Sequence, residues 1–157
     1  MKILLLVVGK TSQDFVEKGL DEFGGRIKHY LPFEIQVIPA IKHAKSLSFD
    51  QQKEKEGEGI LQYLQAGDYV VLLDEQGKEF TSLDFAKYLE KKRQTIPKCL
   101  VFVIGGAYGF SRKIYEAAQE KIALSKMTFS HQLVRLIFVE QLYRAMTILH
   151  QEPYHHV

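Results

Sequence analysis

The chain has 157 residues, of which 46% are hydrophobic and 25% are charged, and its formal net charge is +2 at pH 7. A chain of this length and composition is expected to form one globular domain, residues 1–157, and is neither disordered nor fibrous. The small net charge does not indicate nucleic-acid binding by itself, so only local clusters of basic residues can support that function.

The first predicted strand covers residues 3–8, which are uniformly apolar, as in a parallel sheet whose two faces are both covered. This run is too short to span a membrane and lacks the cleavage pattern of a secretory signal. The single cysteine, Cys99, cannot form a disulfide within the chain. We therefore expect a soluble cytoplasmic protein that has no membrane-spanning segment.

The next two elements are a helix and a short strand. The helix is predicted over residues 12–30, with Ser12 as its N-cap and apolar residues at helical spacing. Gly24–Gly25 weakens its second half by roughly 1 kcal/mol per glycine relative to alanine. The strand, 33–38, lies between two prolines.

The middle of the chain is predicted to hold a helix, a buried strand, a turn and a second helix. Ser48 and Gln51 form a capping-box pattern that begins the first helix, and Thr81 caps the second. These elements cover residues 48–64, 69–73, 75–78 and 83–93.

The C-terminal half begins with an apolar strand that ends abruptly in three glycines, Gly105, Gly106 and Gly109. Ser111 is expected to cap the helix that follows. The predicted elements here are a strand at 100–104, a helix at 111–121, a strand at 122–124 and a helix at 131–150. Helices that alternate with strands predict an α/β fold in which a parallel sheet is flanked by helices.

Two explanations of the three glycines remain open. They form a tight turn that packs a helix on the sheet, or they let a flat ligand lie against bare backbone. The loop is not the dinucleotide-binding fingerprint, because that motif follows the first strand of its unit. Residues 7–12, VVGKTS, are not a phosphate-binding P-loop, because Leu4 stands where the motif needs a glycine.

Apolar residues point in nearly every direction around the last predicted helix, and such a helix must be covered on all sides. One small sheet covers one side, so either another chain or the protein's own loops must cover the rest. Because twofold dimers are the commonest oligomers, we expect a homodimer in which this helix meets its copy. Glu140 and Arg144 lie together on one side, and His131 and Arg135 lie together on the opposite side. A partly buried Glu–Arg pair is more typical of specificity or function than of stability.

Pro153 ends the helical pattern and leaves Tyr154 and His155 in an extended tail. An aromatic side chain next to a histidine, with arginines upstream, suits stacking on a base and contacts to phosphate. A frayed chain end is the alternative. The histidines near the C-terminus have neither a cysteine partner nor a His-x-x-x-His pair, so we expect no metal ion.

Three segments together resemble one family: LLDEQGK at 72–78, FVIGGAYG at 102–109, and LSKMTFSHQLVRLIFVEQLYRA at 124–145 with PYH at 153–155. It is the ribosomal RNA large subunit methyltransferase H family, in the SPOUT class of S-adenosylmethionine-dependent RNA methyltransferases. The resemblance implies a parallel α/β fold with a C-terminal trefoil knot, and a homodimer. It also implies methyl transfer to N3 of a pseudouridine, position 1915 of the family's 23S rRNA target, in the assembled ribosome or its 50S subunit.

The resemblance implies the cofactor site as well. S-adenosylmethionine, which leaves as S-adenosylhomocysteine, would lie against three loops that follow strand ends, and no metal is needed. The matching positions in this chain are Leu73, Gly105, Leu124, Ser125, Lys126, Met127, Thr128 and Phe129.

The catalytic group implied by the resemblance is formed by His155, Glu140, Arg144 and Tyr154. His155 or Glu140 would take the proton from N3, and His155 is favoured because an imidazole titrates near neutral pH. Tyr154 would stack on the base or orient it. Arg144 and Arg135 would bind phosphate or hold the tail.

Two other functions stay open: a non-catalytic, ribosome-associated RNA-binding module, and a flavodoxin-like binder that holds a nucleotide phosphate at the Ser111 helix. Lys42 and Lys45 would extend a basic track for RNA, both in a methyltransferase and in a non-catalytic RNA-binding module. The remaining cluster, Lys91 to Arg93, is expected to be a solvated helix face.

Overall fold

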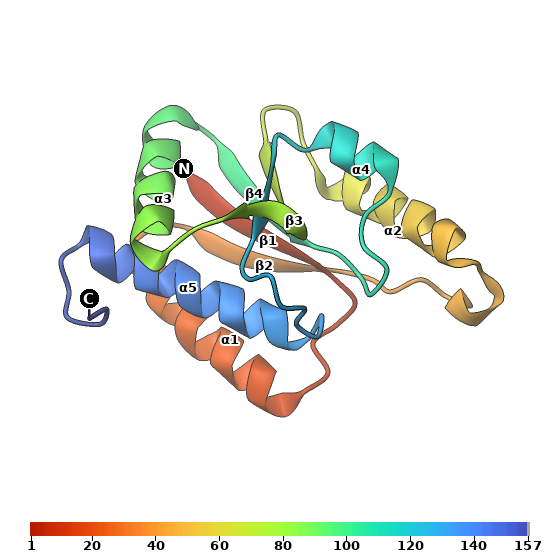
Figure 1. Ribbon diagram of the computed structural model, residues 1–157, viewed down its shortest axis with the longest axis horizontal. Helices are drawn as coiled ribbons and strands as arrows, with labels where there is room; N and C mark the ends of the chain where they lie inside the picture. The colour runs from red at the N-terminus through yellow and green to blue at the C-terminus, as the bar shows by residue number, and fades with distance from the viewer. Residues whose placement is uncertain (157) are drawn as a thin grey trace.

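The computed structural model describes residues 1–156 and contains a five-stranded sheet with the strand order β2-β1-β4-β3-β5 (Figure 1). Every pair of neighbouring strands is parallel. The strands are β1 (Lys2–Val8), β2 (Phe33–Ile38), β3 (Tyr69–Glu79), β4 (Cys99–Ile104) and β5 (Glu120–Ala123). The chain therefore has the parallel α/β architecture that its alternating pattern predicts.

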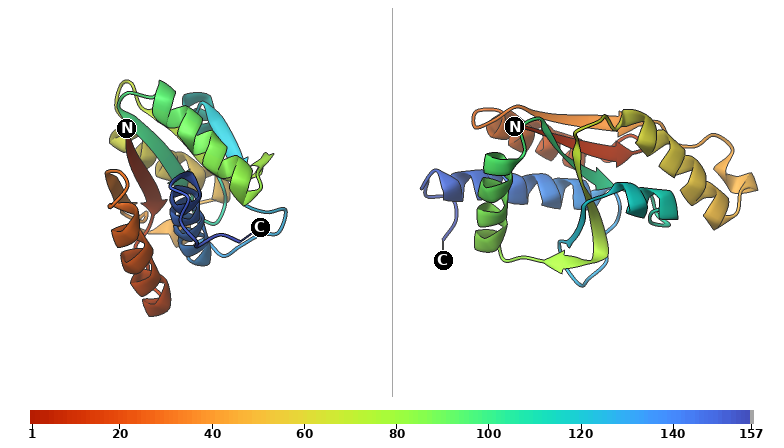
Figure 2. Two further views of the ribbon diagram at one scale, coloured as in Figure 1. Left: turned by 90° about the vertical axis from the view of Figure 1, so that its left-hand side faces the viewer. Right: turned by 90° about the horizontal axis from the view of Figure 1, so that it is seen from above.

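Helices cover both faces of the sheet (Figures 1 and 2). One layer contains α1 (Asp14–Ile27), α3 (Ser82–Thr95) and α5 (Leu133–Leu149), and α5 packs against the other two. The opposite layer contains α2 (Phe49–Tyr63) and α4 (Arg112–Ala117), and a short 3-10 turn, η1 (Ala44–Ser46), precedes α2.

Strand β1, which lies between β2 and β4, contributes to both layers because successive side chains of a strand point to opposite faces. Leu5 and Val7 belong to the core beneath α1, α3 and α5, whereas Leu6 and Val8 belong to the core beneath α2 and α4. None of the four is more than 6% exposed. The uniformly apolar run at 3–8 thus reflects two covered faces, as predicted.

Strand β3 is longer than its apolar run predicts. Residues 75–78, expected to be a turn, form an irregular extension of the strand. At the end of this extension, Lys78 pairs with Ile122 of β5. A Cβ atom on Gly77 would lie 2.6 Å from the backbone of Ile122, so glycine permits this close approach. The extension depends on pairing with a distant segment, which local turn residues do not reveal.

The N-caps predicted at Ser48 and Thr81 are confirmed, and the one predicted at Ser12 is wrong. The capping box of α2 is formed, with Gln51 N donating to Ser48 Oγ (3.2 Å) and Ser48 N donating to Gln51 Oε1 (2.9 Å). Thr81 caps α3 by accepting from the backbone N–H of Asp84. Ser12 does not cap α1, because its own N–H donates to the side chain of Gln132 and the helix begins two residues later.

The segment after the glycine loop also differs from prediction. Helix α4 ends at Ala117, and β5 begins at Glu120, earlier than the predicted strand at 122–124. The reason is pairing with β3: Gln119 N donates to Val70 O, and Val70 N donates to Gln119 Oε1. Ser111 occupies the N-cap position of α4, but its buried hydroxyl has no hydrogen-bond partner among residues 1–156.

The apolar residues of α5 are more fully covered within one chain than the sequence of this helix suggests. Helices α1 and α3 flank α5 and help to bury Phe138, Val139, Leu142, Ala145 and Met146. Other apolar residues of α5 stay partly exposed: Val134, Leu136, Ile137, Tyr143, Ile148 and Leu149. Much of the apolar surface is thus covered within one chain, and a partly apolar face remains.

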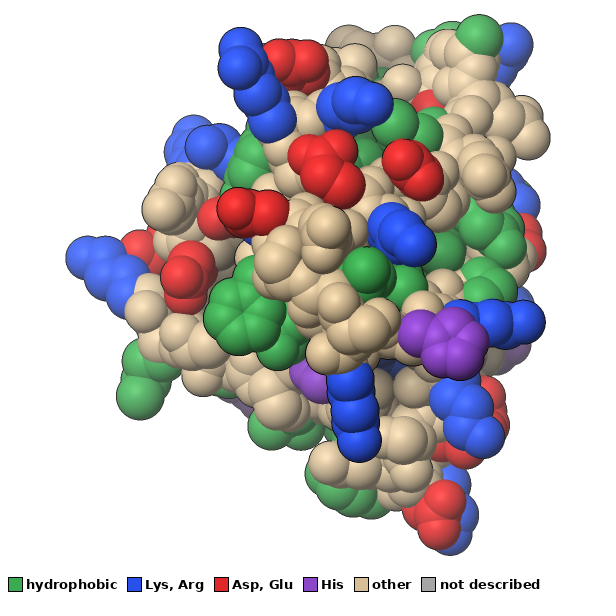
Figure 3. Space-filling view, turned by 90° about the vertical axis from the view of Figure 1, so that its right-hand side faces the viewer, with side chains coloured by type: hydrophobic (Ala, Val, Ile, Leu, Met, Phe, Trp, Pro, Cys, Tyr) green, Lys and Arg blue, Asp and Glu red, His purple; other side chains and the backbone are tan. Residues whose placement is uncertain are grey.

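Within residues 1–156, no helix has both the length and the apolar content needed to cross a bilayer. On the side of the molecule shown in Figure 3, basic and acidic side chains are intermixed, with apolar side chains between them. This mixture agrees with the small net charge of +2.

Candidate functional site

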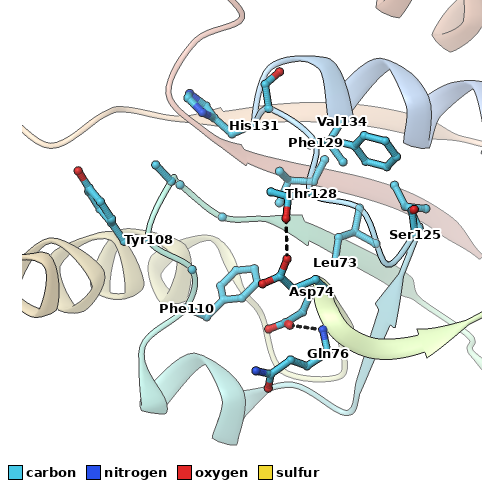
Figure 4. Close-up of a pocket in the computed structure, with 18 of the residues that line it drawn as sticks. Leu73, Asp74, Gln76, Tyr108, Phe110, Ser125, Thr128, Phe129, His131 and Val134 are labelled. Atoms are coloured by element: carbon cyan, nitrogen blue, oxygen red, sulfur yellow. Dashed lines mark hydrogen bonds between the residues drawn. The ribbon is translucent and has the colours of Figure 1, made fainter.

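A cavity of about 580 Å³ lies where β3, β4 and β5 lead into their loops (Figure 4). Three segments far apart in the sequence line it: 73–76, 104–110 and 124–131. Ligands of open α/β sheets bind outside the carboxyl ends of the strands, and cavities of this volume hold small organic molecules. The cavity is therefore the candidate ligand site of the fold.

The glycine loop after β4 is held by contacts on its outer side. A Cβ atom on Gly106 would lie 2.5 Å from a carboxylate oxygen of Glu56, and one on Gly105 would lie 3.0 Å from the ring of Phe110. Burial raises the pKa of Glu56, and a backbone hydrogen bond from Gly106 partly opposes that rise. Both glycines are thus required by close packing, which supports the tight-turn explanation, while their backbone still borders the cavity.

The loop after β5 is joined to the loop after Leu73. Thr128 Oγ1 donates to Glu75 Oε2 at 3.0 Å, and Met127 N donates to Ser125 Oγ at 2.9 Å. Asp74 Oδ1 accepts from Gln76 N at 2.8 Å, and Asp74 Oδ2 accepts from the hydroxyl of Tyr115. These bonds fix two carboxylates, Asp74 and Glu75, beside the cavity.

Burial and the hydrogen bond to Asp74 together raise the pKa of Tyr115 to about 12. The phenol therefore stays protonated near neutral pH and keeps donating to the carboxylate. The two carboxylates of Asp74 and Glu75 on this side of the cavity complement a cationic ligand.

The structure brings most of the predicted cofactor residues together. Those that line the cavity are Leu73, Gly105, Leu124, Ser125, Met127, Thr128 and Phe129. Lys126, also predicted, is exposed and does not line it. Several lining residues were missed by the sequence analysis, among them Asp74, Glu75, Tyr108, Phe110, Tyr115 and Val134. Asp74 and Glu75 directly follow Leu73, but only the fold brings Tyr115 and Val134 to the same place.

Arg135 does not bind phosphate or hold the tail, contrary to the prediction. Its side chain is fully buried and donates to Val8 O (2.8 Å), Gly9 O (2.8 Å) and Thr11 Oγ1 (3.1 Å). Burial lowers the pKa of Arg135. The guanidinium instead ties the segment after β1 to the first turn of α5, because backbone carbonyls are the acceptors that this buried position offers.

The four predicted catalytic residues lie together at the other end of α5. Arg144 Nη2 donates to Glu140 Oε1 at 2.6 Å, and the hydroxyl of Tyr154 donates to the same oxygen at 3.0 Å. Arg144 Nη1 lies 3.1 Å from His155 Nδ1, and its guanidinium stands 4.7 Å from the centre of the Tyr154 ring. The tail is packed rather than frayed, and the Glu140–Arg144 pair is partly buried, as expected.

The contact with Arg144 determines which nitrogen of His155 carries a proton. A guanidinium has no acceptor, so His155 Nδ1 must accept, and the neutral ring then carries its proton on Nε2. In this arrangement His155 offers a hydrogen-bond donor at Nε2. It can take up a proton at Nδ1 only after its contact with Arg144 is broken.

The cavity and the catalytic cluster do not meet within one chain. The cavity reaches Val134 in the first turn of α5, whereas His155 lies against Arg144. Ten residues of α-helix separate these two positions, which corresponds to roughly 15 Å along the axis. In Figure 1 the C-terminal tail lies beside the C-terminal end of α5, and the loop that leads into this helix lies at the opposite end.

The predicted basic residues behave differently from one another. Lys42 and Lys45 are exposed, as expected. Lys92 is not part of a solvated face, because its amino group donates to Glu120 (2.8 Å) and to the hydroxyl of Tyr69 (2.9 Å) and its side chain is 15% exposed. Over residues 1–156, no three His, Cys, Asp or Glu side chains are grouped closely enough to hold a metal ion.

Comparison with known proteins agrees with the geometry of the cavity. A family described as "Predicted SPOUT methyltransferase" matches residues 1–155. The chain is 65% identical to the ribosomal RNA large subunit methyltransferase H of Parabacteroides distasonis, 61% identical to that of Phocaeicola vulgatus and 60% identical to that of Bacteroides thetaiotaomicron. Each match extends over 156 residues and covers 99% of both chains. The chain thus belongs to the ribosomal RNA large subunit methyltransferase H family of SPOUT methyltransferases.

Proposed function

We propose that the chain transfers a methyl group from S-adenosylmethionine to N3 of a pseudouridine in the large-subunit rRNA of the assembled ribosome. The observation that carries this proposal is the cavity built from three loops at the strand ends, in a chain of this family. The relatives named above are methyltransferases of large-subunit ribosomal RNA. The C-terminal trefoil knot expected of the family, and the single domain over residues 1–157, are parts of the same proposal.

The residues around the cavity fit S-adenosylmethionine. Leu73, Leu124 and Phe129 offer apolar surface to a flat ring, and the backbone at Gly105 offers polar groups without a side chain in the way. Asp74 and Glu75 complement the positive charge of the cofactor. When bound, it supplies a methyl group on a sulfonium sulfur, which is a good leaving group without help from a metal.

We assign the acceptor side of the site to Glu140, Arg144, Tyr154 and His155 of a second copy of the chain. This assignment is supported by the separation of about 15 Å along α5 between Val134, which lines the cavity, and Arg144, which contacts His155 in the same chain. It is also supported by the partly exposed apolar residues that α5 retains. A homodimer that pairs the α5 helices would let the tail of one copy complete the site of the other.

In this assignment Glu140 holds Arg144 and Tyr154, and these two side chains hold the tail. The Tyr154 ring is placed to stack on or orient a base, and Arg144 is the group for phosphate. His155 takes the N3 proton once its Nδ1 has left Arg144, and it stabilises the base as an Nε2 donor before that. Transfer then breaks the carbon–sulfur bond, forms the carbon–nitrogen bond and leaves S-adenosylhomocysteine.

The proposal is tested with the purified full-length chain. Calorimetry with S-adenosylmethionine is expected to show one site per chain, and an excess of cofactor at 100 times its dissociation constant should stabilise the fold by about 2.7 kcal/mol. Mass spectrometry of large-subunit rRNA from treated ribosomes is expected to show one added methyl group on a pseudouridine. Cofactor binding without any methylated nucleotide would refute the proposed reaction.

The flavodoxin-like alternative is not favoured by the geometry. Helix α4 is a single short piece, and Ser111 at its N-terminus is 4% exposed, with its hydroxyl close to the Cβ position of Gly57 rather than directed to open solvent. A phosphate has no open approach to this hydroxyl. The expected preference is therefore for S-adenosylmethionine over FMN or ATP in a thermal-shift assay.

A further inference from the structure

Two exposed aromatic rings are stacked at the rim of the cavity. The rings of Phe49 and Tyr108 have centroids 4.1 Å apart and planes that differ by 19°. Phe49 is 61% exposed and Tyr108 is 43% exposed, so the pair leaves large aromatic surface in water. Neither ring belongs to the buried core, and of the two only Tyr108 is among the residues that line the cavity.

Both rings stand on backbone that is fixed. Phe49 is the first residue of α2, directly after the capping box of Ser48. Tyr108 lies in the turn that Gly109 N closes by donating to Gly106 O at 3.3 Å, and Gly106 is itself bonded to Glu56 of α2. The same helix thus holds both halves of the stack, so little conformational entropy is lost when a further ring is added.

The stack points away from the cofactor cavity. Figure 4 shows the side chain of Tyr108 extending outward from the loop, whereas Phe110 of the same loop turns inward. Tyr108 also lines part of the cavity, whereas Phe49 does not. A ligand on the outer face of this stack therefore lies beside the cavity rather than in it.

A basic segment is attached next to the stack. Gln52 Nε2 donates to Ala44 O (3.0 Å) and to Leu47 O (3.4 Å), which ties η1 and its neighbours to the first turns of α2. Lys42 and Lys45 on this segment are exposed and form no ion pair within the part of the chain that the structure describes. Free lysines near an open aromatic face suit a ligand that is both flat and anionic.

We propose that Phe49 and Tyr108 form a stacking platform for an unpaired base of the RNA substrate, with Lys42 and Lys45 near the flanking phosphates. The proposal rests on the proposed function, since it takes the substrate to be RNA. Aromatic side chains beside lysines are the usual elements of single-strand recognition. A protein partner is less well matched, because the rings are flanked by the exposed polar residues Ser48 and Asp50 instead of a broad apolar patch.

Charge alone would attract RNA only weakly to this side of the molecule. Basic and acidic side chains are mixed over the face in Figure 3, and the net charge is only +2. Long-range attraction of RNA is correspondingly small. Stacking supplies a contact that salt does not screen, and it requires no particular base because every base has a flat face.

The test uses the full-length chain as wild type and as Phe49→Leu, Tyr108→Leu, Phe49→Tyr and Phe15→Leu. Leucine keeps apolar bulk but removes the ring, tyrosine keeps the ring, and Phe15 on α1 is a matched control because it is 60% exposed. The probe is a single-stranded RNA pentamer that contains 2-aminopurine, whose fluorescence falls on stacking. Methylation of large ribosomal subunits and calorimetry with S-adenosylmethionine are measured in parallel.

The wild type, Phe49→Tyr and Phe15→Leu are expected to quench the pentamer equally. Phe49→Leu and Tyr108→Leu are expected to bind it roughly fivefold or more weakly, which is the low end of the effect of losing one base stack. On ribosomal subunits, KM is expected to rise more than kcat falls, while the cofactor affinity of Phe49→Leu, whose residue does not line the cavity, stays the same. Loss of methylation with unchanged pentamer binding would instead indicate a protein partner and overturn the platform.

Other outcomes also overturn it: no quenching by the wild type, an equal loss in Phe15→Leu, or weaker cofactor binding in Phe49→Leu. A shift of Phe49→Leu from dimer to monomer in sedimentation would assign the rings to a second copy of the chain. The proposed function fails separately, if the wild type does not methylate ribosomal subunits at all. Normal methylation with an unchanged KM in Phe49→Leu would refute the platform alone.

Discussion

Strand β5 leads into the third loop of the cavity, and one carboxylate at its start joins it to α3 and β3. Glu120 Oε1 accepts from the hydroxyl of Tyr69 (2.7 Å) and from Lys92 (2.8 Å), and Glu120 Oε2 accepts from the hydroxyl of Tyr88 (2.5 Å). The Glu120 side chain is 32% exposed. We therefore expect Glu120→Gln to destabilise the fold measurably.

The magnitude follows from what glutamine keeps and what it loses. With its amide oxygen in the place of Oε1, glutamine still accepts from Tyr69 and Lys92, but its amide nitrogen in the place of Oε2 cannot accept from the hydroxyl of Tyr88, and the charge is lost. Hydrogen bonds to charged groups contribute about 1.5–3 kcal/mol each, and partial exposure puts the expected loss near 2 kcal/mol. For a chain of this size, that corresponds to a fall in Tm of about 4–8 °C.

A matched control exists at the other side of the sheet. Lys2 and Glu34 form an ion pair at 2.6 Å, but their side chains are 44% and 49% exposed. Exposed pairs contribute about 0–1 kcal/mol, so Glu34→Gln should change stability much less although its pair is shorter. Urea unfolding of both variants at one protein concentration measures the difference.

The stability lost in Glu120→Gln is expected to depend on pH, which provides a second test. Burial raises the pKa of Glu120, but the hydrogen bonds from Lys92, Tyr88 and Tyr69 outweigh burial, so its pKa in the folded chain is below its ordinary value of 4.5. The stabilisation is complete above the unfolded pKa and is lost as the pH falls through the lowered folded pKa. Equal deficits in the two variants, or a Glu120→Gln deficit that does not shrink from about pH 5 to about pH 2.5, would refute the reasoning.

Three further variants test the loops and the tail. Gly106→Ala is expected to break the bond to Glu56 and weaken binding of S-adenosylmethionine about fivefold by calorimetry, and adding Glu56→Ala should restore part of the affinity. Arg135→Met leaves buried carbonyls unpaired and should cost about 3 kcal/mol in urea unfolding; no loss would show that these carbonyls find other partners. His155→Gln keeps a donor near the position of Nε2 but no base, so single-turnover rates at saturating RNA should fall; an unchanged rate would assign His155 a donor role only.

Features that depend on a few neighbouring residues were predicted correctly from the sequence. The capping box of Ser48 and Gln51 is local, and it begins α2 where expected. The apolar run at 3–8 forms the interior strand β1 because a doubly covered strand needs no polar positions. The partly buried pair of Glu140 and Arg144 follows from helical spacing among apolar neighbours.

Features that depend on distant segments were missed. Ser12 looks like an N-cap, but its N–H is taken by Gln132, which is 120 residues away. Lys92 looks like a surface lysine, yet Glu120 of β5 lies within reach of it. Residues 75–78 have the composition of a turn and still rejoin the sheet, because β5 presents a free edge there.

The sequence by itself determined the order of the strands and helices along the chain and a parallel sheet flanked by helices, because periodicity and capping act over one or two turns. The three segments that line the expected cofactor site were identified by their resemblance to the family. Only the tertiary structure decided that these segments border one cavity, that Arg135 is buried against the backbone after β1, and that His155 binds Arg144 far from the cavity. The physical reason is that such contacts join groups more than ten residues apart along the chain. Their partners are chosen by the packing of whole helices and strands and not by local propensity.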